Sequence, residues 1–189
     1  MEYVIERASL DDPKAIHAYL NEIAAGKPDV LFLRPNGFPF DQVEKLIESS
    51  YESTDDLFLV AKTKSDILGT LTFSRYSKME TRHSGDFGMS VHPDHRRKGI
   101  GNRLIEELES WAQANGLCKI ELQVWSNNIP AIRLYEKLGY ETEGMRKGAI
   151  LRDGNRYDSI LMGKFIGQPA FSAEREDHAP AEEHVGLQT

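Results

Sequence analysis

The stretch Val91–Leu104, VHPDHRRKGIGNRL, constrains this chain more than any other part of its sequence. An apolar run, Phe87–Val91, leads into it and predicts a strand, and a helical pattern opens at Gly99 and Gly101 after a polar turn. The first N–H groups of a helix lack partners within the helix, and the helix dipole favours negative charge there. Glycine also lets the backbone approach a phosphate closely. The sequence therefore predicts an anion-binding site between this strand and this helix.

Three consecutive cations, Arg96, Arg97 and Lys98, add positive charge to the same turn. They could form a solvated charge run. Beside two glycines at a helix start, however, phosphate contact is the better interpretation, with the backbone contributing most of it. The turn matches neither G-x-G-x-x-G nor G-x-x-x-x-G-K-[ST], so the nucleotide-binding folds that those motifs mark are not indicated.

Two sequence blocks resemble the GNAT family of N-acetyltransferases. The residues from Arg96 to Gly101 fit the family pattern (Q/R)xxGx(G/A). The block Asn128–Tyr140 is similar to the family segment NxxAxxLYxxxGF, with Tyr140 in place of the usual Phe. The blocks have the family's order and separation. The resemblance implies a mixed α/β (α+β) fold in three layers, whose central, mostly antiparallel sheet is splayed at an acetyl-CoA cleft.

The resemblance also implies acetyl-CoA as co-substrate. Backbone N–H groups of the glycine turn would hold its pyrophosphate, and the strand just before the turn would hold its pantetheine arm. Asn128, among the best capping residues, would cap the second motif helix and contact the pantetheine arm as well. The cofactor-binding residues expected in this way are Met89, Ser90, Val91, Arg96, Arg97, Lys98, Gly99, Ile100, Gly101, Asn102, Asn128, Ala131 and Tyr135.

Acetyl transfer from a thioester to an amine needs a polarised carbonyl, a neutral amine and a proton for the leaving thiolate. Backbone N–H groups near Met89–Val91 could polarise the carbonyl. Tyr135 is the candidate general acid, because a phenol with a pKa near ~10 can protonate a thiolate and the resemblance places it on the family's acid tyrosine. Its alternative role is packing on a buried helix face.

Asp86 is the candidate general base, because many family members carry an acidic residue at roughly this offset before the central strand. Against this role, an Asp at a strand edge is more often solvated or ion-paired. Glu80 and His83 are weaker alternatives on a polar loop.

Hydrophobic periodicity predicts the remaining elements. Strands are expected at Tyr3–Arg7, Leu57–Lys62, Ile67–Ser74, Asp86–Val91, Lys119–Trp125, Tyr140–Gly144 and Asp158–Lys164. Besides the two motif helices, one helix is expected from Pro13 and a second from Asp41, with Asp41 as its cap and Leu46 facing inward. The segments Val30–Phe40 and Arg75–Ser84 are expected to be loops. Leu31–Phe40 and Arg75–Ser84 are the candidates for building the acceptor pocket.

The length of 189 residues predicts one domain, at residues 1–166. From residue 167 the composition changes, and residues 168–189 hold one basic and five acidic residues, so residues 167–189 are expected to form a disordered acidic tail. The net charge of −7 argues against a general nucleic-acid binder. No apolar run approaches the ~20 residues of a membrane span, and no secretory signal is visible.

The single cysteine, Cys118, allows no intrachain disulfide, so a cytoplasmic location is expected. His92 and His95 flank Asp94 and could suggest a metal site, but a turn leaving a strand is the favoured interpretation, and no metal is expected.

The function expected from these features is acetyl-CoA-dependent N-acetylation of a primary amine on a small molecule. Direct transfer in a ternary complex is favoured, since no activated Cys or Ser nucleophile is evident. The segments Gly85–Gly88 and Ala149–Met162 resemble a bacterial branch that acetylates free amino acids and related small amines. Two alternatives stay open: acetylation of a protein N-terminus or lysine, and a non-catalytic acyl-CoA-binding regulatory module. The sequence also leaves open whether the protein is a monomer or a homodimer.

Overall fold

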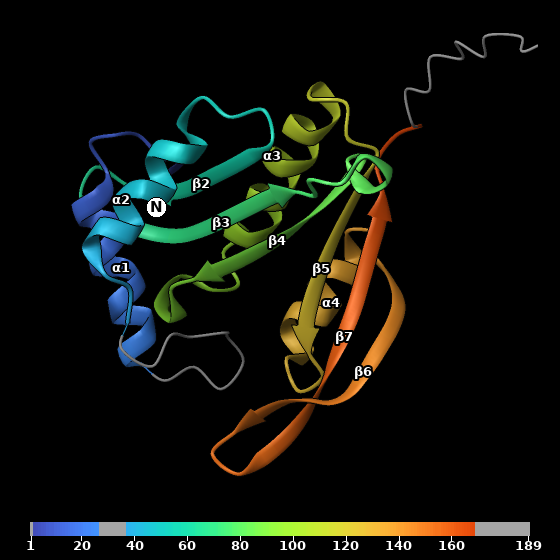
Figure 1. Ribbon diagram of the computed structural model, residues 1–189. Coiled ribbons are helices and arrows are strands. Elements are labelled where there is room, and N and C mark those ends of the chain that lie inside the picture. The colour runs from blue at the N-terminus through green and yellow to red at the C-terminus, as the bar shows by residue number, and fades with distance from the viewer. Residues whose placement is uncertain (1, 27–36, 169–189) are drawn as a thin grey trace, which may run out of the picture.

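A computed structural model describes residues 2–26 and 37–168 of the chain (Figure 1). Seven strands form one sheet in the order β1-β2-β3-β4-β5-β7-β6. Every neighbouring pair is antiparallel except β4 and β5, which are parallel. The strands are β1 Val4–Arg7, β2 Asp56–Lys62, β3 Ile67–Arg75, β4 Ser84–Val91, β5 Lys119–Trp125, β6 Glu141–Arg152 and β7 Asn155–Phe165. The helices are α1 Pro13–Ala25, α2 Phe40–Tyr51, α3 Ile100–Ala114 and α4 Ile129–Lys137. The predicted mixed α/β fold with a mostly antiparallel sheet is confirmed.

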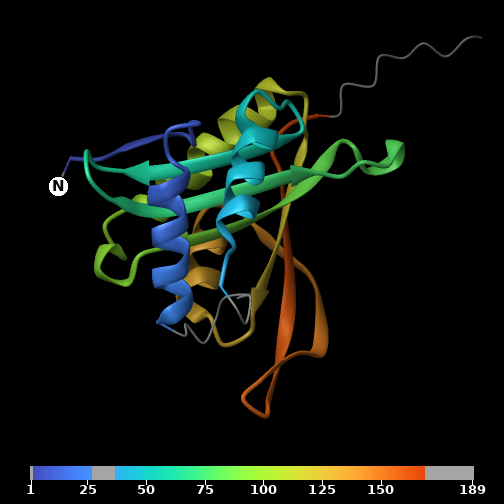
Figure 2. The same cartoon turned by 60° about the vertical axis from the view of Figure 1, so that its left-hand side comes forward.

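The helices cover both faces of the sheet, with α1 and α2 on one face and α3 and α4 on the other (Figure 2). Strand β2 alternates between the two resulting cores, since side chains of a strand point to opposite faces in turn. Leu57 and Leu59 belong to the larger core with α3 and α4, whereas Phe58 and Val60 pack with α1 and α2. Among the described helices, none is long and apolar enough to cross a membrane.

The start of α2 corrects two sequence predictions. The helix begins at Phe40, one residue before the predicted cap, with Pro39 at the N-cap position. Asp41 therefore lies in the first turn, where its charge suits the helix dipole, and it pairs with Lys45 at 3.7 Å. Leu46 is also not inward: it is 42% exposed and lines an open groove of about 410 Å³ beside α1.

The loops predicted to build the acceptor pocket are only partly visible. Residues 30–36 of the first loop, and residues 169–189 of the predicted tail, lie outside the described part of the chain. The tail and the domain boundary at 166 therefore stay predictions. The second loop connects β3 to β4 and holds a short 3₁₀ helix, η1 Met79–Thr81.

The hairpin of β6 and β7 is much longer than its sequence pattern predicted. The two strands project well past the body of the molecule and meet at the turn between Arg152 and Asn155 (Figures 1 and 2). The register shifts twice, between Thr142 and Gly144 and between Arg146 and Ile150. Most of β6 is exposed, so no alternation of apolar and polar residues marked its far half.

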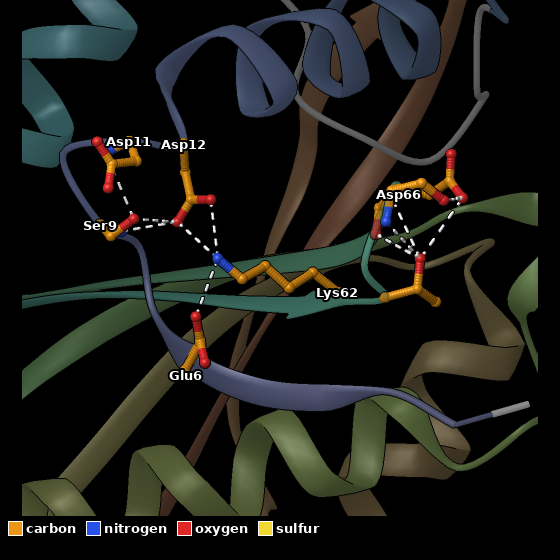
Figure 3. Close-up of polar contacts among 8 residues, drawn as sticks. Glu6, Ser9, Asp11, Asp12, Lys62 and Asp66 are labelled. Atoms are coloured by element: carbon orange, nitrogen blue, oxygen red, sulfur yellow. Dashed lines mark hydrogen bonds and ion pairs between the residues drawn. The ribbon is translucent and has the colours of Figure 1, made fainter.

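A polar network fastens the start of α1 to the sheet (Figure 3). The Lys62 ammonium on β2 donates to both carboxylate oxygens of Asp12, at 2.8 and 3.0 Å, and pairs with Glu6 on β1 at 2.9 Å. Asp12 also accepts from the backbone N–H and the hydroxyl of Ser9, each at 2.8 Å. Asp12 holds the N-cap position of α1 without a cap hydrogen bond, because its side chain turns to these partners instead.

The sheet divides at β4 and β5, as predicted for a splayed cleft. These two strands pair only through Ser84–Asp86 and Lys119–Glu121. Beyond Asp86, β4 stays paired with β3 as far as Val91, while β5 stays paired with β7 as far as Trp125. The two halves of the sheet thus separate from a fork whose last rung is the pair Asp86 and Glu121, and the separation is visible in Figure 1.

Candidate active site

The basic glycine turn joins the open end of β4 to α3, as the sequence predicted. Two of its residues adopt left-handed backbone angles, Arg97 with φ 59° and Gly99 with φ 82°. Gly99 is the N-cap of α3 and supplies no side-chain cap. The first N–H groups of α3, from Ile100 to Asn102, therefore have no partner within the helix and are available to an anion.

The two glycines of the turn are needed for different reasons. A Cβ at Gly99 would meet nothing within 4 Å, so the left-handed backbone is what requires glycine there. A Cβ at Gly101 would come within 3.1 Å of Leu134 and 3.4 Å of Met89. Gly101 therefore lets α3 pack closely against α4 and β4, and a bulky residue there would disturb that packing directly.

The three cations of the turn differ in what their side chains contact. Arg96 donates to the carbonyl oxygen of Val91 at 3.1 Å, and Lys98 donates to the carbonyl oxygen of Asp94 at 2.8 Å. Arg97 is exposed, and in the described part of the chain its guanidinium makes no hydrogen bond or ion pair. Two of the cations thus shape the turn, and Arg97 has its charge available for a ligand.

The backbone of β4 presents polar groups to the cleft. The N–H of His92 donates to Leu68 of β3, and alternate residues of an antiparallel strand point the same way. Met89 and Val91 therefore direct their N–H and C=O groups away from β3, toward the gap where β5 has separated. These are the backbone groups that the sequence predicted would contact a thioester.

Ser90 points to the other face of β4. Its hydroxyl hydrogen bonds to the Tyr19 hydroxyl on α1 at 2.9 Å and to Thr70 on β3 at 3.0 Å. Burial raises the pKa of Tyr19 to about 12, although the bond to Ser90 lowers it. The side chain of Ser90 thus ties α1 to β4, and its backbone, like that of His92, faces β3, where Ser90 is the register partner of Thr70. The predicted cofactor contact of Ser90 stays a prediction.

Tyr135 lies on α4, in the core beneath the fork. Its ring packs edge-on against Phe87 of β4 at 5.8 Å and Tyr140 at 6.0 Å, and the residue is 7% exposed. Burial raises the pKa of the Tyr135 phenol to about 12. Within the described residues its hydroxyl has no hydrogen-bond partner, so the predicted donor is protonated and uncommitted.

Asn128 is the N-cap of α4, as predicted. Its side-chain oxygen accepts from the backbone N–H of Ala131 at 3.3 Å. This bond uses the amide oxygen of Asn128 and leaves the amide NH₂ group for other contacts. Asn128 and Ala131 follow β5 directly, so both lie on the opposite side of the gap from the β4 backbone.

Asp86 lies at the fork on the face opposite Tyr135. Phe87 points into the core with Tyr135, so its neighbour Asp86 points to the face of α1 and α2. The residue is exposed overall, yet partial burial of its carboxyl, together with the charge of Glu121, raises its pKa despite an opposing hydrogen bond from its own backbone N–H. The two predicted catalytic residues are therefore not in contact; they flank the same strand from its two faces.

Sequence reasoning missed two residues beside Asp86. Glu121 is its partner across the parallel β4–β5 ladder, and the Tyr76 hydroxyl donates to Glu121 at 3.3 Å. Burial and the charge of Glu121 raise the pKa of Tyr76 to about 12. The alternation of Lys119, Glu121 and Gln123 with apolar residues in β5 marked an outward face, but only the strand pairing places Glu121 beside Asp86. Glu80 and His83, the alternative bases, are exposed in or beside η1.

The two histidines after β4, His92 and His95, lie in a turn. His92 accepts from the backbone N–H of Asp94 through Nδ1 at 3.3 Å and contacts Glu22 through Nε2 at the same distance. In residues 2–26 and 37–168, no group of three or more His, Cys, Asp or Glu side chains could hold a metal ion. Cys118 is a buried free thiol.

Comparison with known proteins decides the family. The family model described as "Acetyltransferase (GNAT) family" matches residues 28–140, more than half of the chain. The chain belongs to the GNAT acetyltransferase family. It is 33% identical over 110 residues to the L-amino acid N-acetyltransferase AaaT of Escherichia coli, an alignment that spans 56% of this chain and 66% of that protein, just under two thirds of its length.

Solved acetyltransferase structures have the same fold over nearly their whole length. A GNAT acetyltransferase from Streptococcus pneumoniae superposes with a TM-score of 0.81 at 27% identity, covering 87% of this chain and 99% of that one. The putative acetyltransferase yncA of Salmonella typhimurium, solved with acetyl-CoA, superposes with a TM-score of 0.79 at 21% identity, covering 90% and 97%. The predicted enzyme class, N-acetyltransferase, and the predicted co-substrate, acetyl-CoA, are confirmed as those of the family.

The residues of this GNAT chain fit that co-substrate. A pyrophosphate needs unpaired N–H groups and positive charge, which the start of α3 and Arg97 offer. A pantetheine arm carries amide groups that pair with an extended backbone, and the gap beside Met89 and Val91 offers one.

Proposed function

We propose that this protein transfers the acetyl group of acetyl-CoA directly to the primary amine of a small molecule, an amino acid or a related amine. The observation that carries the proposal is the fork itself. It leaves a backbone edge of β4 unpaired, with a protonated phenol on one face and a carboxylate of raised pKa on the other. Donor and acceptor can therefore meet from opposite faces of the sheet.

The donor side is assigned to the glycine turn and the open edge of β4. The N–H groups of Ile100–Asn102 and the side chain of Arg97 would hold the pyrophosphate, and Asn128 with Ala131 would line the far wall beside α4. The N–H groups of Met89 and Val91 point where a thioester carbonyl oxygen would carry developing negative charge.

The acceptor side is assigned to Asp86. Amino groups are protonated near neutral pH, and attack requires a lone pair, so the Asp86 carboxylate takes one proton from the ammonium. The neutral nitrogen then forms its bond to the acetyl carbon while the carbon–sulfur bond breaks. A carboxylate with a raised pKa is a stronger base than an ordinary one, which suits this step.

Tyr135 is assigned to the leaving group. The thiolate takes the phenolic proton, and the second proton of the attacking nitrogen leaves through solvent to restore the phenol. A pKa of about 12 keeps the phenol protonated in the resting enzyme. The same apolar core that raises this pKa also destabilises an unprotonated thiolate, which favours the transfer as the sulfur departs.

The small-amine acceptor is supported by the relative AaaT, whose name gives L-amino acids as its substrates. Ribosomal-protein alanine N-acetyltransferases share the fold at 17–21% identity, a likeness that concerns the fold alone. Protein N-termini and lysines are accordingly the alternative acceptors to test.

The test is a screen for CoA release with a free-thiol readout. The panel holds single amino acids, polyamines, aminoglycosides and peptides with a free N-terminus. We expect acetyl-CoA-dependent thiol release with at least one free amino acid or small amine, and a mass increase of one acetyl group on that amine. Release with peptides alone would replace the small-molecule acceptor by a protein, and acetyl-CoA binding without release for any amine would favour a non-catalytic binding module.

A further inference from the structure

The last rung of the fork brings two acidic side chains together on the acceptor face. In the parallel β4–β5 ladder, Asp86 is the register partner of Glu121, and the ladder ends at this pair. Side chains of paired residues in neighbouring strands point to the same face and lie close together. Like charges in that position destabilise each other, so the pair requires an explanation.

The two members of the pair have unequal surroundings. Glu121 is held by the Tyr76 hydroxyl at 3.3 Å and by the Lys119 ammonium at 3.3 Å. Lys119 in turn pairs with Glu143 of β6 at 2.9 Å. Asp86 has no such partner in the described part of the chain beyond its own backbone N–H, and its neighbour on β3 is the uncharged Ser74. Glu121 is therefore the member held in place by neighbouring side chains, and Asp86 is the member without them.

The other groups around the pair do not change this assignment. Tyr76 is neutral over the physiological range, since its pKa is raised to about 12. Burial lowers the pKa of Lys119, but Glu143 and Glu121 raise it more, so Lys119 is a cation. Its charge is shared between two carboxylates that it contacts directly. The negative charge that acts on Asp86 is that of Glu121.

We infer that Glu121 is a positioning residue for the reaction: fixed by Tyr76 and Lys119 at the last rung of the fork, it makes Asp86 the stronger proton acceptor of the pair. This inference rests on the proposed role of Asp86. Its chemistry is a single proton transfer, in which the acceptor ammonium loses a proton and the Asp86 carboxylate gains it. Glu121 neither gains nor loses a proton; its charge stabilises the protonated form of Asp86.

The first experiment measures the proton affinity of Asp86 in the absence of acetyl transfer. Carboxyl-carbon NMR titration follows Asp86 in the full-length wild type and in Glu121→Gln, which keeps the size and loses the charge. We expect the midpoint of Asp86 to move to lower pH in Glu121→Gln. The matched control is Glu143→Gln, which removes the other partner of Lys119 and should leave the midpoint of Asp86 in place. An unchanged midpoint in Glu121→Gln overturns the inference.

The second experiment measures the effect of Glu121 on Asp86 through the pH dependence of acetyl transfer. The acidic limb of the kcat/KM profile with an active amine should move to lower pH in Glu121→Gln, and the plateau should fall because Asp86 is then a weaker base. A purely structural role for Glu121 would lower the plateau and leave the limb in place, which counts against the inference. Loss of all turnover in Glu121→Gln, while Asp86→Asn stays active, would make Glu121 itself the base and overturn it as well.

The two hypotheses fail in different ways. A wild type without acetyl transfer to any amine overturns the proposed function, whereas the NMR midpoints still decide whether Glu121 acts on Asp86. A wild type that transfers acetyl groups, with midpoints that do not differ, retains the proposed function and removes only the role of Glu121.

Discussion

Two carboxylates of this protein, Asp12 and Asp86, are each placed beside a lysine-containing network, yet the networks treat them in opposite ways. At Asp12, burial alone would raise the pKa, but hydrogen bonds from Lys62 and Ser9 outweigh it and the pKa is lowered. At Asp86, burial raises the pKa, and the charge of Glu121 raises it further. The cation near Asp86, Lys119, contacts Glu121 and Glu143 instead.

This difference separates a carboxylate that holds the fold from one that can react. Asp12 is 9% exposed and has a partner for each oxygen, so its charge is fully used in fastening α1 to β2. Asp86 is exposed at the fork and keeps a lone pair for a proton. A perturbed pKa points to a functional site when its cause is burial and like charge rather than a salt bridge.

The largest effect should follow from neutralising Asp86. In Asp86→Asn we expect kcat to fall by roughly 10²–10⁴-fold, the usual contribution of general base catalysis, while acetyl-CoA affinity changes little. Steady-state kinetics and calorimetry with acetyl-CoA provide the measurement. The control is Glu80→Gln on η1, which removes an exposed acid nearby and should keep wild-type turnover. Equal turnover in Asp86→Asn and wild type would remove Asp86 from the reaction.

Tyr135, on the opposite face of the fork, should give an effect of similar or smaller size. Tyr135→Phe keeps the ring contacts with Phe87 and Tyr140 and deletes only the hydroxyl. We expect single-turnover acetyl transfer to slow by roughly 10²–10⁴-fold, and by less where solvent can supply the proton. Single-turnover rates across pH make the measurement. Rates equal to wild type at every pH would leave Tyr135 as a packing residue.

The parts of the site that could be predicted from sequence are those that depend on neighbouring residues in the chain. The glycine turn and the cap at Asn128 each involve a few consecutive residues, so their motifs carry the geometry. The cap predicted at Asp41 was wrong by two residues, since Pro39 ends the preceding extended segment and is the N-cap, and Phe40 already joins the helix. Helix boundaries depend on such details and are poorly marked in a sequence.

The parts that could not be predicted depend on strand pairing across long separations. Asp86 and Glu121 lie on strands joined through α3, and only the parallel register brings them together. The far half of the β6–β7 hairpin was missed for a related reason. Both its faces are largely exposed, so no apolar face imposes the alternation from which strands are recognised. For this reason, neither the contact between Asp12 and Lys62 nor the pairing of Asp86 with Glu121 could be predicted from the sequence.

A smaller effect, on stability, should follow from the Asp12 network. Asp12→Asn keeps the volume but removes the charge that Lys62 pairs with, and it replaces one oxygen acceptor by a donor. We expect the free energy of unfolding to fall by about 1–3 kcal/mol, the usual cost of leaving a largely buried polar group poorly paired. Urea unfolding of the variant and the wild type gives this value. The control, Glu6→Gln, removes the more exposed partner of Lys62 and should cost less.

Asp86→Asn should not share that loss of stability. Asp86 is exposed and has no cation partner in the described residues, so its charge contributes nothing that Asn would remove. We expect the variant to unfold within about 0.5 kcal/mol of the wild type, as is usual for surface substitutions. A loss as large as that of Asp12→Asn would show that Asp86 also holds the fold, and the distinction between the two carboxylates would fail.

The smallest expected effect is the pH dependence of two stability differences, one between the wild type and Asp12→Asn and one between the wild type and Asp86→Asn. This pH dependence is also the most specific test of the comparison between the two carboxylates. Asp12 has a folded pKa below its unfolded value of about 3.9, so its contribution is complete above that value and disappears as the pH falls through the folded pKa. The wild type should therefore gain stability over Asp12→Asn as the pH rises through the acidic range. Asp86 has a folded pKa above its unfolded value, so its ionisation is disfavoured in the folded state. The wild type should lose stability relative to Asp86→Asn as the pH rises through that folded pKa.

Urea unfolding of the three proteins between about pH 3 and about pH 7 measures both differences at once. The two curves should have opposite slopes, and the slope for Asp86 should be the shallower one because solvent screens an exposed carboxyl. Slopes of the same sign would mean that one of the two carboxylates has a different partner in solution from the one described here. Because the slope depends only on the protons bound by the folded and unfolded states, this result is independent of any assumption about substrate or turnover.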